Sequence, residues 1–214
     1  MKNICIAIVL PFFIACSAQN NHKTIEKEQL NLEHYKTAYF ASGCFWCVEA
    51  VFESVEGVVE AESGYAGGHT AKPTYSSIGT GKTGHSETVK VYYDPDKVDY
   101  STLLNVYYGS HNPFTVNGQH PDYGSQYRSI IFYKTESEKK KAEEAKLSID
   151  KQSEEKVATE IVPFTKFHIA EDYHQDYERL HPNQPYVKNV SIPRLNRFKK
   201  AFPHLLKPKA KLKE

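Results

Sequence analysis

The stretch Gly43-Cys44-Phe45-Trp46-Cys47 holds the only tryptophan of the chain and two of its four cysteines. The short apolar segment 38–41 in front of it is typical of a strand, which Ser42-Gly43 then ends. Behind it, four apolar side chains recur at i, i+3, i+4 and i+7, the spacing of one buried helical face: Val48, Val51, Phe52 and Val55. The pattern predicts a strand, a tight turn and a helix with Cys44 in its first turn.

The position of Cys44 favours a reactive thiol. The first turn of a helix offers unpaired backbone N–H groups and the positive end of the dipole, and both favour a thiolate. Cys47 follows three residues later, on the same side of the helix and within disulfide reach. The alternative is ordinary core packing of two inert cysteines, because a C-x-x-C motif alone is only a moderate signal.

The first 18 residues have the pattern of an export signal. Lys2 is their only charged residue, residues 4–14 are apolar, and small residues follow. The segment is too short to span a membrane. Two processing routes stay open, namely lipid modification of Cys16, which lies in a lipobox-like sequence, or cleavage after Ala18. We expect an exported protein, either periplasmic or a membrane-anchored lipoprotein.

The rest of the chain divides into a polar tether over 19–36, a domain over 37–198 and a lysine-rich, solvated tail over 199–214. Without residues 1–18 the chain carries 26 basic and 26 acidic side chains, and a formally neutral domain is a poor candidate for nucleic-acid binding. An exported domain with two thiols in a C-x-x-C motif is more typical of a redox site than of a disulfide scaffold.

Residues 86–93 form the clearest strand, and they contain an anomaly. Val89, Val91 and Tyr93 alternate with polar positions and face the core, and Glu87 lies on that same face. A carboxyl group facing an apolar layer has a raised pKa. Alternatively, Glu87 lies at the end of the strand and reaches water or an arginine.

The predicted elements follow the order strand, helix, strand, strand, helix, strand, beginning near residues 39, 44, 58, 87, 101 and 128. This order predicts an α+β fold with a ferredoxin-like split β-α-β core in a two-layer sandwich, followed by a C-terminal extension. We further expect a glycine-rich loop over 64–69, a long helix over 136–157 and another helix over 170–180.

The polar segment 110–126 is predicted to be a long loop, and loops of this length in compact domains tend to be functional. It contains His111 and His120, but these lack the spacing of zinc ligands, so we expect no metal.

Six motifs resemble the A-type peptide methionine sulfoxide reductases, in the order of that family and over about residues 39–185. They are Gly43-Cys44-Phe45-Trp46-Cys47, Gly64-Tyr65-Ala66-Gly67-Gly68, Gly84-His85-Ser86-Glu87, Asn117-Gly118-Gln119, Asp122-Tyr123-Gly124-Ser125-Gln126-Tyr127-Arg128-Ser129 and Ala170-Glu171-Asp172-Tyr173-His174-Gln175. The resemblance implies reduction of methionine-S-sulfoxide, free and in proteins, as repair of oxidative damage.

The resemblance also implies roles for individual residues. Cys44 would attack the sulfoxide sulfur, and Glu87 would donate a proton to the sulfoxide oxygen. Tyr75 and Tyr127 would hydrogen-bond that oxygen. The remaining implied roles concern substrate binding: Phe45 and Trp46 would form the pocket for the ε-methyl group, and Asp122 would help to position the substrate.

Attack would leave Cys44 as a sulfenic acid, which a second thiol must resolve. Many members of the family use a cysteine in the C-terminal tail, but this chain has none there, so the role falls to Cys47. The resulting disulfide would be reduced by thioredoxin, an exported thioredoxin-like protein or a small dithiol, with no other cofactor. The alternatives are a general C-x-x-C thiol-disulfide oxidoreductase and a surface lipoprotein that binds a partner or metal.

Overall fold

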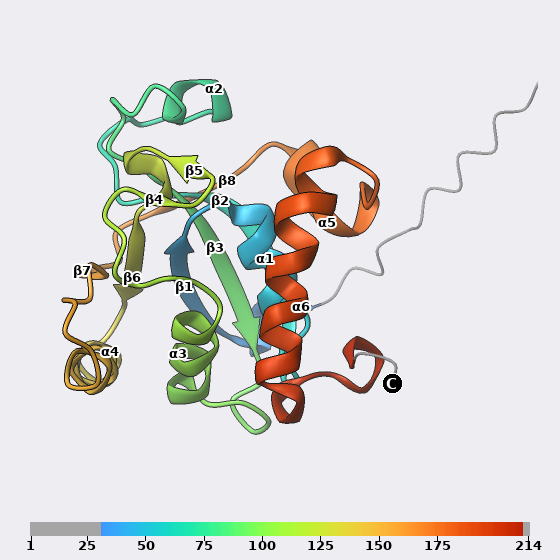
Figure 1. The fold of residues 1–214 in the computed structure, drawn as a ribbon. Helices are drawn as coiled ribbons and strands as arrows, with labels where there is room; N and C mark the ends of the chain where they lie inside the picture. The colour runs from blue at the N-terminus through green and yellow to red at the C-terminus, as the bar shows by residue number, and fades with distance from the viewer. Residues whose placement is uncertain (1–30, 212–214) are drawn as a thin grey trace, which may run out of the picture. The chain divides into compact units, whose positions relative to one another are not determined.

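The computed structural model describes residues 31–211 (Figure 1), so the predicted signal peptide and most of the predicted tether lie outside the described residues. A six-stranded sheet has the order β7-β6-β1-β3-β2-β8, in which β6 and β7 are parallel and the other neighbours are antiparallel. Its strands are β1 (Lys36–Ser42), β2 (Val58–Ala66), β3 (Ser86–Tyr93), β6 (Ser129–Tyr133), β7 (Glu160–Pro163) and β8 (Phe167–Ile169). Together with the helices, this sheet confirms the α+β class.

The helices and a small hairpin complete the fold. The helices are α1 (Phe45–Glu53), α2 (Tyr75–Ile78), α3 (Tyr100–Gly109), α4 (Glu136–Asp150), α5 (Tyr177–Leu180) and α6 (Ile192–Ala201), and the hairpin consists of β4 (Gly118–Gln119) and β5 (Asp122–Tyr123). Short helical turns lie at Leu32–His34, Ser125–Tyr127, Asp172–His174, Val187–Ser191, Pro203–Leu205 and Pro208–Ala210.

The main core lies between the sheet and helices α1 and α3 (Figure 1). Phe40 of β1 is fully buried, and its ring stacks on Phe52 of α1 at 5.0 Å and on Tyr107 of α3 at 5.3 Å between centroids. Burial of each such side chain stabilises the fold by roughly 1.5–3 kcal/mol. The apolar face predicted for α1 therefore fixes the helix that begins beside Cys44.

A smaller core covers the opposite face of the sheet. There the Tyr39 ring stacks on Phe164 at 3.9 Å, close to Ile130 and Phe132 of β6. Both faces of the central strands are thus covered, which holds the turn after β1 in place.

Several element boundaries differ from the sequence prediction. Gly64, Tyr65 and Ala66 belong to β2 instead of a loop, because they pair with both β3 and β8. Helix α4 ends at Asp150, and the helix expected over 170–180 divides into the turn Asp172–His174 and α5. No helix among residues 31–211 is both long and apolar enough to span a membrane.

The packed domain also ends later than residue 198, where the sequence analysis placed the start of a solvated tail. Helix α6 continues to Ala201, and Leu206 is buried and forms an isolated bridge with Val55. The Glu56 N–H donates to the Leu205 carbonyl at 2.8 Å, and the Lys207 N–H donates to the Ser54 carbonyl at 2.9 Å. Apolar residues between the lysines thus attach this segment to the end of α1.

Candidate active site

The turn between β1 and α1 places Cys44 at the helix start. Gly43 has φ +87°, a conformation that favours glycine, and a Cβ there would lie 2.7 Å from Gln119 Cβ. Helix α1 begins at Phe45, so Cys44 caps the helix instead of lying in its first turn, and its carbonyl accepts the N–H groups of Cys47 and Val48. The thiol is buried, with 6% of Cys44 exposed.

Glu87 occupies the helix N-terminus in place of the thiol. Its Oε2 accepts the Phe45 backbone N–H at 2.9 Å, and only 1% of the residue is exposed. Burial raises the pKa of Glu87 to about 8, with a smaller contribution from the charge of Asp122, although the Phe45 hydrogen bond acts in the opposite direction. Glu87 is therefore mostly protonated at pH 7, and the expectation that it faces the core is confirmed.

The two thiols have opposite acidities. Cys44 and Cys47 are both free and buried, and their side chains are hydrogen-bonded to each other. Burial, followed by the hydrogen bond to Cys47, raises the pKa of Cys44. The hydrogen bond from Cys44 lowers the pKa of Cys47 to about 7, and the charge of Arg194 lowers it further while burial opposes both. Burial and the contact with Cys47 thus oppose the resting thiolate that the sequence predicts on Cys44.

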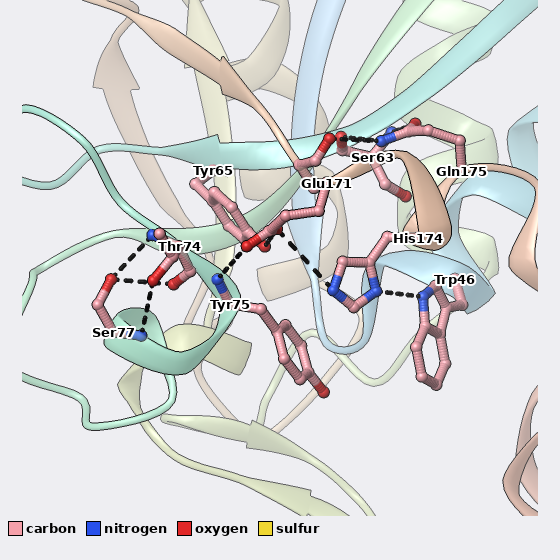
Figure 2. A network of polar contacts seen from close by, with 10 residues as sticks. Trp46, Ser63, Tyr65, Thr74, Tyr75, Ser77, Glu171, His174 and Gln175 are labelled. Atoms are coloured by element: carbon pink, nitrogen blue, oxygen red, sulfur yellow. Dashed lines mark hydrogen bonds and ion pairs between the residues drawn. The ribbon is translucent and has the colours of Figure 1, made fainter.

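An aromatic wall adjoins the thiols. The Phe45 ring stacks on Tyr75 at 6.2 Å between centroids, and the Trp46 ring stacks on Tyr177 at 3.8 Å. His174 lies between Trp46 and Tyr75, as Figure 2 shows, and its Nδ1 accepts the Trp46 indole N–H at 3.2 Å. Burial lowers the pKa of His174, so the ring is neutral and acts as a fixed acceptor.

Glu171 fixes the start of α2, where Tyr75 lies (Figure 2). Its Oε2 accepts the hydroxyl of the buried Tyr65 at 2.7 Å, and its Oε1 accepts the Tyr75 backbone N–H at 3.0 Å. Because Nδ1 of His174 accepts the Trp46 N–H, the single proton of the neutral ring is on Nε2. This Nε2 lies 4.0 Å from Glu171 Oε2. This network joins β2, α2 and the turn before α5 around the aromatic wall.

Asp122 closes the site from the β4-β5 hairpin. Its carboxylate accepts the hydroxyl of Tyr186, which in turn lies 3.9 Å from Cys47 Sγ. Burial raises the pKa of Asp122. Burial also raises the pKa of Tyr75 to about 12 and that of Tyr127 further, so both hydroxyls keep their protons and can donate.

The structure brings all the predicted site residues together. Glu87 accepts the Phe45 N–H. It lies close enough to Tyr75 and Tyr127 that, after burial, its ionised form is the next cause that raises the pKa of both hydroxyls, and Cys44 and Asp122 contribute to both as well. The eight residues are Cys44, Phe45, Trp46, Cys47, Tyr75, Glu87, Asp122 and Tyr127. A buried thiol pair thus faces a protonated carboxyl group, two phenol donors and an aromatic pocket.

The profile of the protein family "Peptide methionine sulfoxide reductase" matches residues 36–206. The chain belongs to this family. It therefore reduces methionine sulfoxide, and the enzymes of this family take electrons from thiols without a prosthetic cofactor.

Curated reductases and solved structures agree with this assignment. The chain is 46% identical over 168 residues to peptide methionine sulfoxide reductase MsrA of Sulfolobus acidocaldarius, covering 78% of this chain and 96% of the relative. It is 44% identical over 171 residues to the MsrA of Thermus thermophilus, covering 80% and 97%. Reduced Mxr1 of Saccharomyces cerevisiae has a TM-score of 0.65 at 30% identity, covering 70% of this chain and 87% of that one. Methionine sulfoxide reductase A of Corynebacterium diphtheriae has a TM-score of 0.64 at 32% identity, covering 70% and 76%.

The reductase site also contains residues to which the sequence analysis gave no role. Tyr65, Glu171 and His174 lie within motifs that carry the family resemblance. The sequence therefore singled out these positions but did not indicate what each residue does. Tyr186 and Arg194 lie outside every quoted motif, and no local spacing indicates that they approach Cys47.

In the described part of the chain, one carboxylate group could suit a metal: Glu49, Glu53 and Asp176 each have an oxygen within 4.8 Å of the others. However, Glu49 Oε1 already accepts the Asp176 backbone N–H at 2.7 Å, and its other oxygen accepts the Ser63 hydroxyl. Burial raises the pKa of Glu49 to about 8, so this carboxyl is protonated at neutral pH and is a poor ligand.

Proposed function

We propose that Cys44 reduces the substrate by attacking the sulfoxide sulfur. In the resting pair, the Cys47 thiolate accepts the Cys44 proton as the Cys44 sulfur attacks. Glu87 donates its proton to the sulfoxide oxygen, and that oxygen leaves with Cys44 as a sulfenic acid while methionine is released. The proton count balances, because Glu87 ends ionised and Cys47 ends as a thiol.

The neighbouring side chains support this step. Tyr75 and Tyr127 keep their protons and can donate hydrogen bonds to the sulfoxide oxygen as negative charge develops on it. Phe45 and Trp46 form the apolar wall for the methyl group, and Asp122 helps to position the substrate. The same pocket would select the S epimer of free and protein-bound methionine sulfoxide.

In the second step, we propose that the Cys47 sulfur attacks the Cys44 sulfenic acid. A Cys44–Cys47 disulfide forms, and the hydroxyl of the sulfenic acid leaves as water with the Cys47 proton. The contact between the two thiols supports this pairing. Two electrons from a dithiol, thioredoxin or an exported thioredoxin-like protein then restore both thiols.

The observation that carries this proposal is the buried Glu87 carboxyl bonded to the N–H group next to Cys44. The test is turnover of a methionine-S-sulfoxide substrate with dithiothreitol, with wild type beside Cys44→Ser and Glu87→Gln. We expect no turnover in the cysteine variant and a large loss in the glutamate variant. Activity against disulfides that survives Glu87→Gln, without sulfoxide reduction, would instead support the general oxidoreductase.

We also propose export of the protein, with a lipid at Cys16 as the membrane anchor, on the basis of the signal-like residues 1–18. Labelling of cells with a fatty-acid analogue tests this, because the label should disappear in Cys16→Ala. A label that persists in the variant, or is absent from the wild type, would exclude the anchor.

For the fold, we propose that β6-β1-β3-β2 is a ferredoxin-like split β-α-β core. Antiparallel pairing throughout these four strands, with α1 and α3 as the helical connections, supports this class. An experimental structure with another strand order would refute it.

A further inference from the structure

A cavity of about 580 Å³ lies beside Cys47. Its walls come from the segment after α3, the β4-β5 hairpin, the turn Val187–Ser191 and α6. Cys47 lines this cavity, whereas Cys44, Glu87, Tyr75 and Tyr127 do not. The two thiols therefore face different surroundings: Cys44 lies beside the acid and the phenols, and Cys47 borders this cavity, which shares Asp122 with the site.

The cavity contains a buried positive charge. Arg194 is 9% exposed, and its guanidinium donates to the Ser110 carbonyl at 2.7 Å, to the Ser42 carbonyl at 3.0 Å and to the Ser42 hydroxyl at 3.3 Å. A guanidinium has five N–H donors, so two have no acceptor among residues 31–211. Within the same range, no carboxylate lies within ion-pair distance of Arg194.

Other charged and titratable groups around the cavity are mainly basic. Arg197 lies one helical turn after Arg194 and is exposed, and His120 lies on the hairpin. Burial lowers the pKa of His111 to about 3, so this histidine adds no charge. Asp122 is the acidic exception, and its carboxylate already accepts the Tyr186 hydroxyl.

Oxidation changes the charge balance in this cavity. In the reduced pair, the negative charge on Cys47 partly neutralises the guanidinium. A Cys44–Cys47 disulfide carries no charge, so oxidation leaves Arg194 buried with neutral acceptors and with the carboxyl groups of Asp122 and Glu178 as its acidic neighbours, neither within ion-pair distance. A buried charge that loses its counter-charge attracts an anion. The oxidised enzyme thus presents a positive cavity directly beside one sulfur of its disulfide.

From this arrangement we infer that the cavity is a binding site for a small thiol that carries a carboxylate, which reduces the oxidised enzyme by attacking Cys47. The inference rests on the proposed disulfide and adds a site, a ligand class and the sulfur that is attacked. The recessed position of Cys47, 2% exposed at the cavity wall, suits a small molecule that enters the cavity.

The chemistry of the step balances. The thiolate of the small molecule attacks Cys47 Sγ, the disulfide bond breaks, and Cys44 leaves as a thiolate that takes up a proton. A second thiolate then attacks the small-molecule sulfur of the mixed disulfide and releases Cys47 as a thiolate. Two small thiols are oxidised to one disulfide, and the enzyme disulfide is reduced to two thiols.

Cys44 is a suitable leaving group in this step despite its high pKa in the reduced enzyme. Burial is the largest cause of this high pKa, and the hydrogen bond and the negative charge of Cys47 follow. The two contributions of Cys47 are absent while Cys47 is bound to the reductant. The cavity that Cys47 lines and the charge of Arg194 therefore both direct the attack to Cys47.

The test uses full-length enzyme oxidised with one equivalent of methionine sulfoxide. Its reduction is followed with 3-mercaptopropionate and with the neutral 3-mercaptopropionamide, each rate constant being corrected for the thiolate fraction. We expect the anionic thiol to react faster, and we expect the ratio of the two rate constants to fall about fivefold in Arg197→Gln and further in Arg197→Glu. The ratio should also fall as salt is added. Lys200→Gln is the matched control, because it removes the same charge from an exposed position of α6 that does not line the cavity.

The mixed disulfide identifies the attacked sulfur. Acid quenching during reduction, followed by proteolysis and mass spectrometry, should find the small thiol on Cys47. An unchanged ratio in both Arg197 variants, a ratio that falls equally in Lys200→Gln, or a mixed disulfide on Cys44 would overturn the inference. If the oxidation step yields no methionine and no disulfide, it is the proposed function that has failed.

Discussion

Replacement of Glu87 by glutamine removes the acidic proton of this residue but keeps the size and shape of its side chain. The amide oxygen of glutamine can still accept the Phe45 N–H, so the start of α1 keeps its hydrogen bond. With a pKa of about 8, Glu87 is about 90% protonated at pH 7, and glutamine has no comparable acidic proton. Loss of a general acid typically lowers the rate by about 10²- to 10⁴-fold, or about 3–5 kcal/mol of transition-state stabilisation.

The same substitution should stabilise the fold. An unfolded glutamate with the ordinary pKa of 4.5 is ionised at pH 7, whereas folded Glu87 is mostly protonated, and this difference costs about 3 kcal/mol of folding free energy. The cost is absent below pH 4.5, grows as pH rises and levels off above pH 8. Glu87→Gln should therefore raise the unfolding free energy at pH 8 and leave it nearly unchanged at pH 4.

The assay combines two measurements. The rate constant for methionine release is followed in single turnovers from pH 6 to 9.5, and urea unfolding is followed at pH 4 and pH 8. Wild-type activity should decline above about pH 8 as Glu87 loses its proton, and the variant should lack this decline. Two results would refute the assignment of Glu87 as a buried, protonated acid. One is a Glu87→Gln variant that keeps more than a tenth of the wild-type rate, and the other is a variant that is less stable than wild type at pH 8.

Three further predictions follow from the same contacts. Cys47→Ser should release one equivalent of methionine without forming a disulfide. The release should be slower than in wild type at pH 7, because serine cannot accept the Cys44 proton. Quenched-flow measurement of released methionine and titration of the remaining free thiols test both outcomes. His174→Ala should raise KM for the sulfoxide and lower stability by about 2–4 kcal/mol, since it removes a buried ring and the acceptor of the Trp46 N–H; steady-state kinetics and urea unfolding measure both. Leu206→Ala should lower stability by a similar amount of about 2–4 kcal/mol without changing KM, because this side chain packs at the end of α1.

Local sequence patterns predicted much of the fold. The apolar spacing from Val48 to Val55 placed α1, and the alternation along residues 86–93 placed Glu87 on the buried face before any contact was known. Both predictions succeed because a helix or strand buries one face, which leaves a period in the sequence. The motifs of the family resemblance added the site residues from the other elements.

Long-range contacts were not predictable in this way. The charge of Arg194 lowers the pKa of Cys47, which lies almost 150 residues earlier in the chain. Nothing in the spacing of apolar residues along α6 indicates that interaction. The lysines after residue 198 suggested a solvated tail because charge dominates the composition there. Leu206 attaches that segment to the end of α1 through its buried side chain and its bridge with Val55. A single apolar residue among lysines does not form a periodic pattern, so the sequence does not indicate this contact.

The missed contacts also bear on the proposed role of the high-pKa thiol as the nucleophile. For thiolates, nucleophilicity rises with pKa, so the Cys44 sulfur is the stronger attacking group once its proton is gone. Cys47 has a pKa of about 7 and is hydrogen-bonded to Cys44, so it is the base placed to take that proton. In a thiol-disulfide oxidoreductase the low-pKa thiol of a C-x-x-C motif is usually the one that attacks. Here burial and the neighbouring Cys47 raise the pKa of one cysteine, and the hydrogen bond from Cys44, aided by a buried guanidinium, lowers that of the other. In the proposed mechanism, the same motif therefore supplies a nucleophile with its own base.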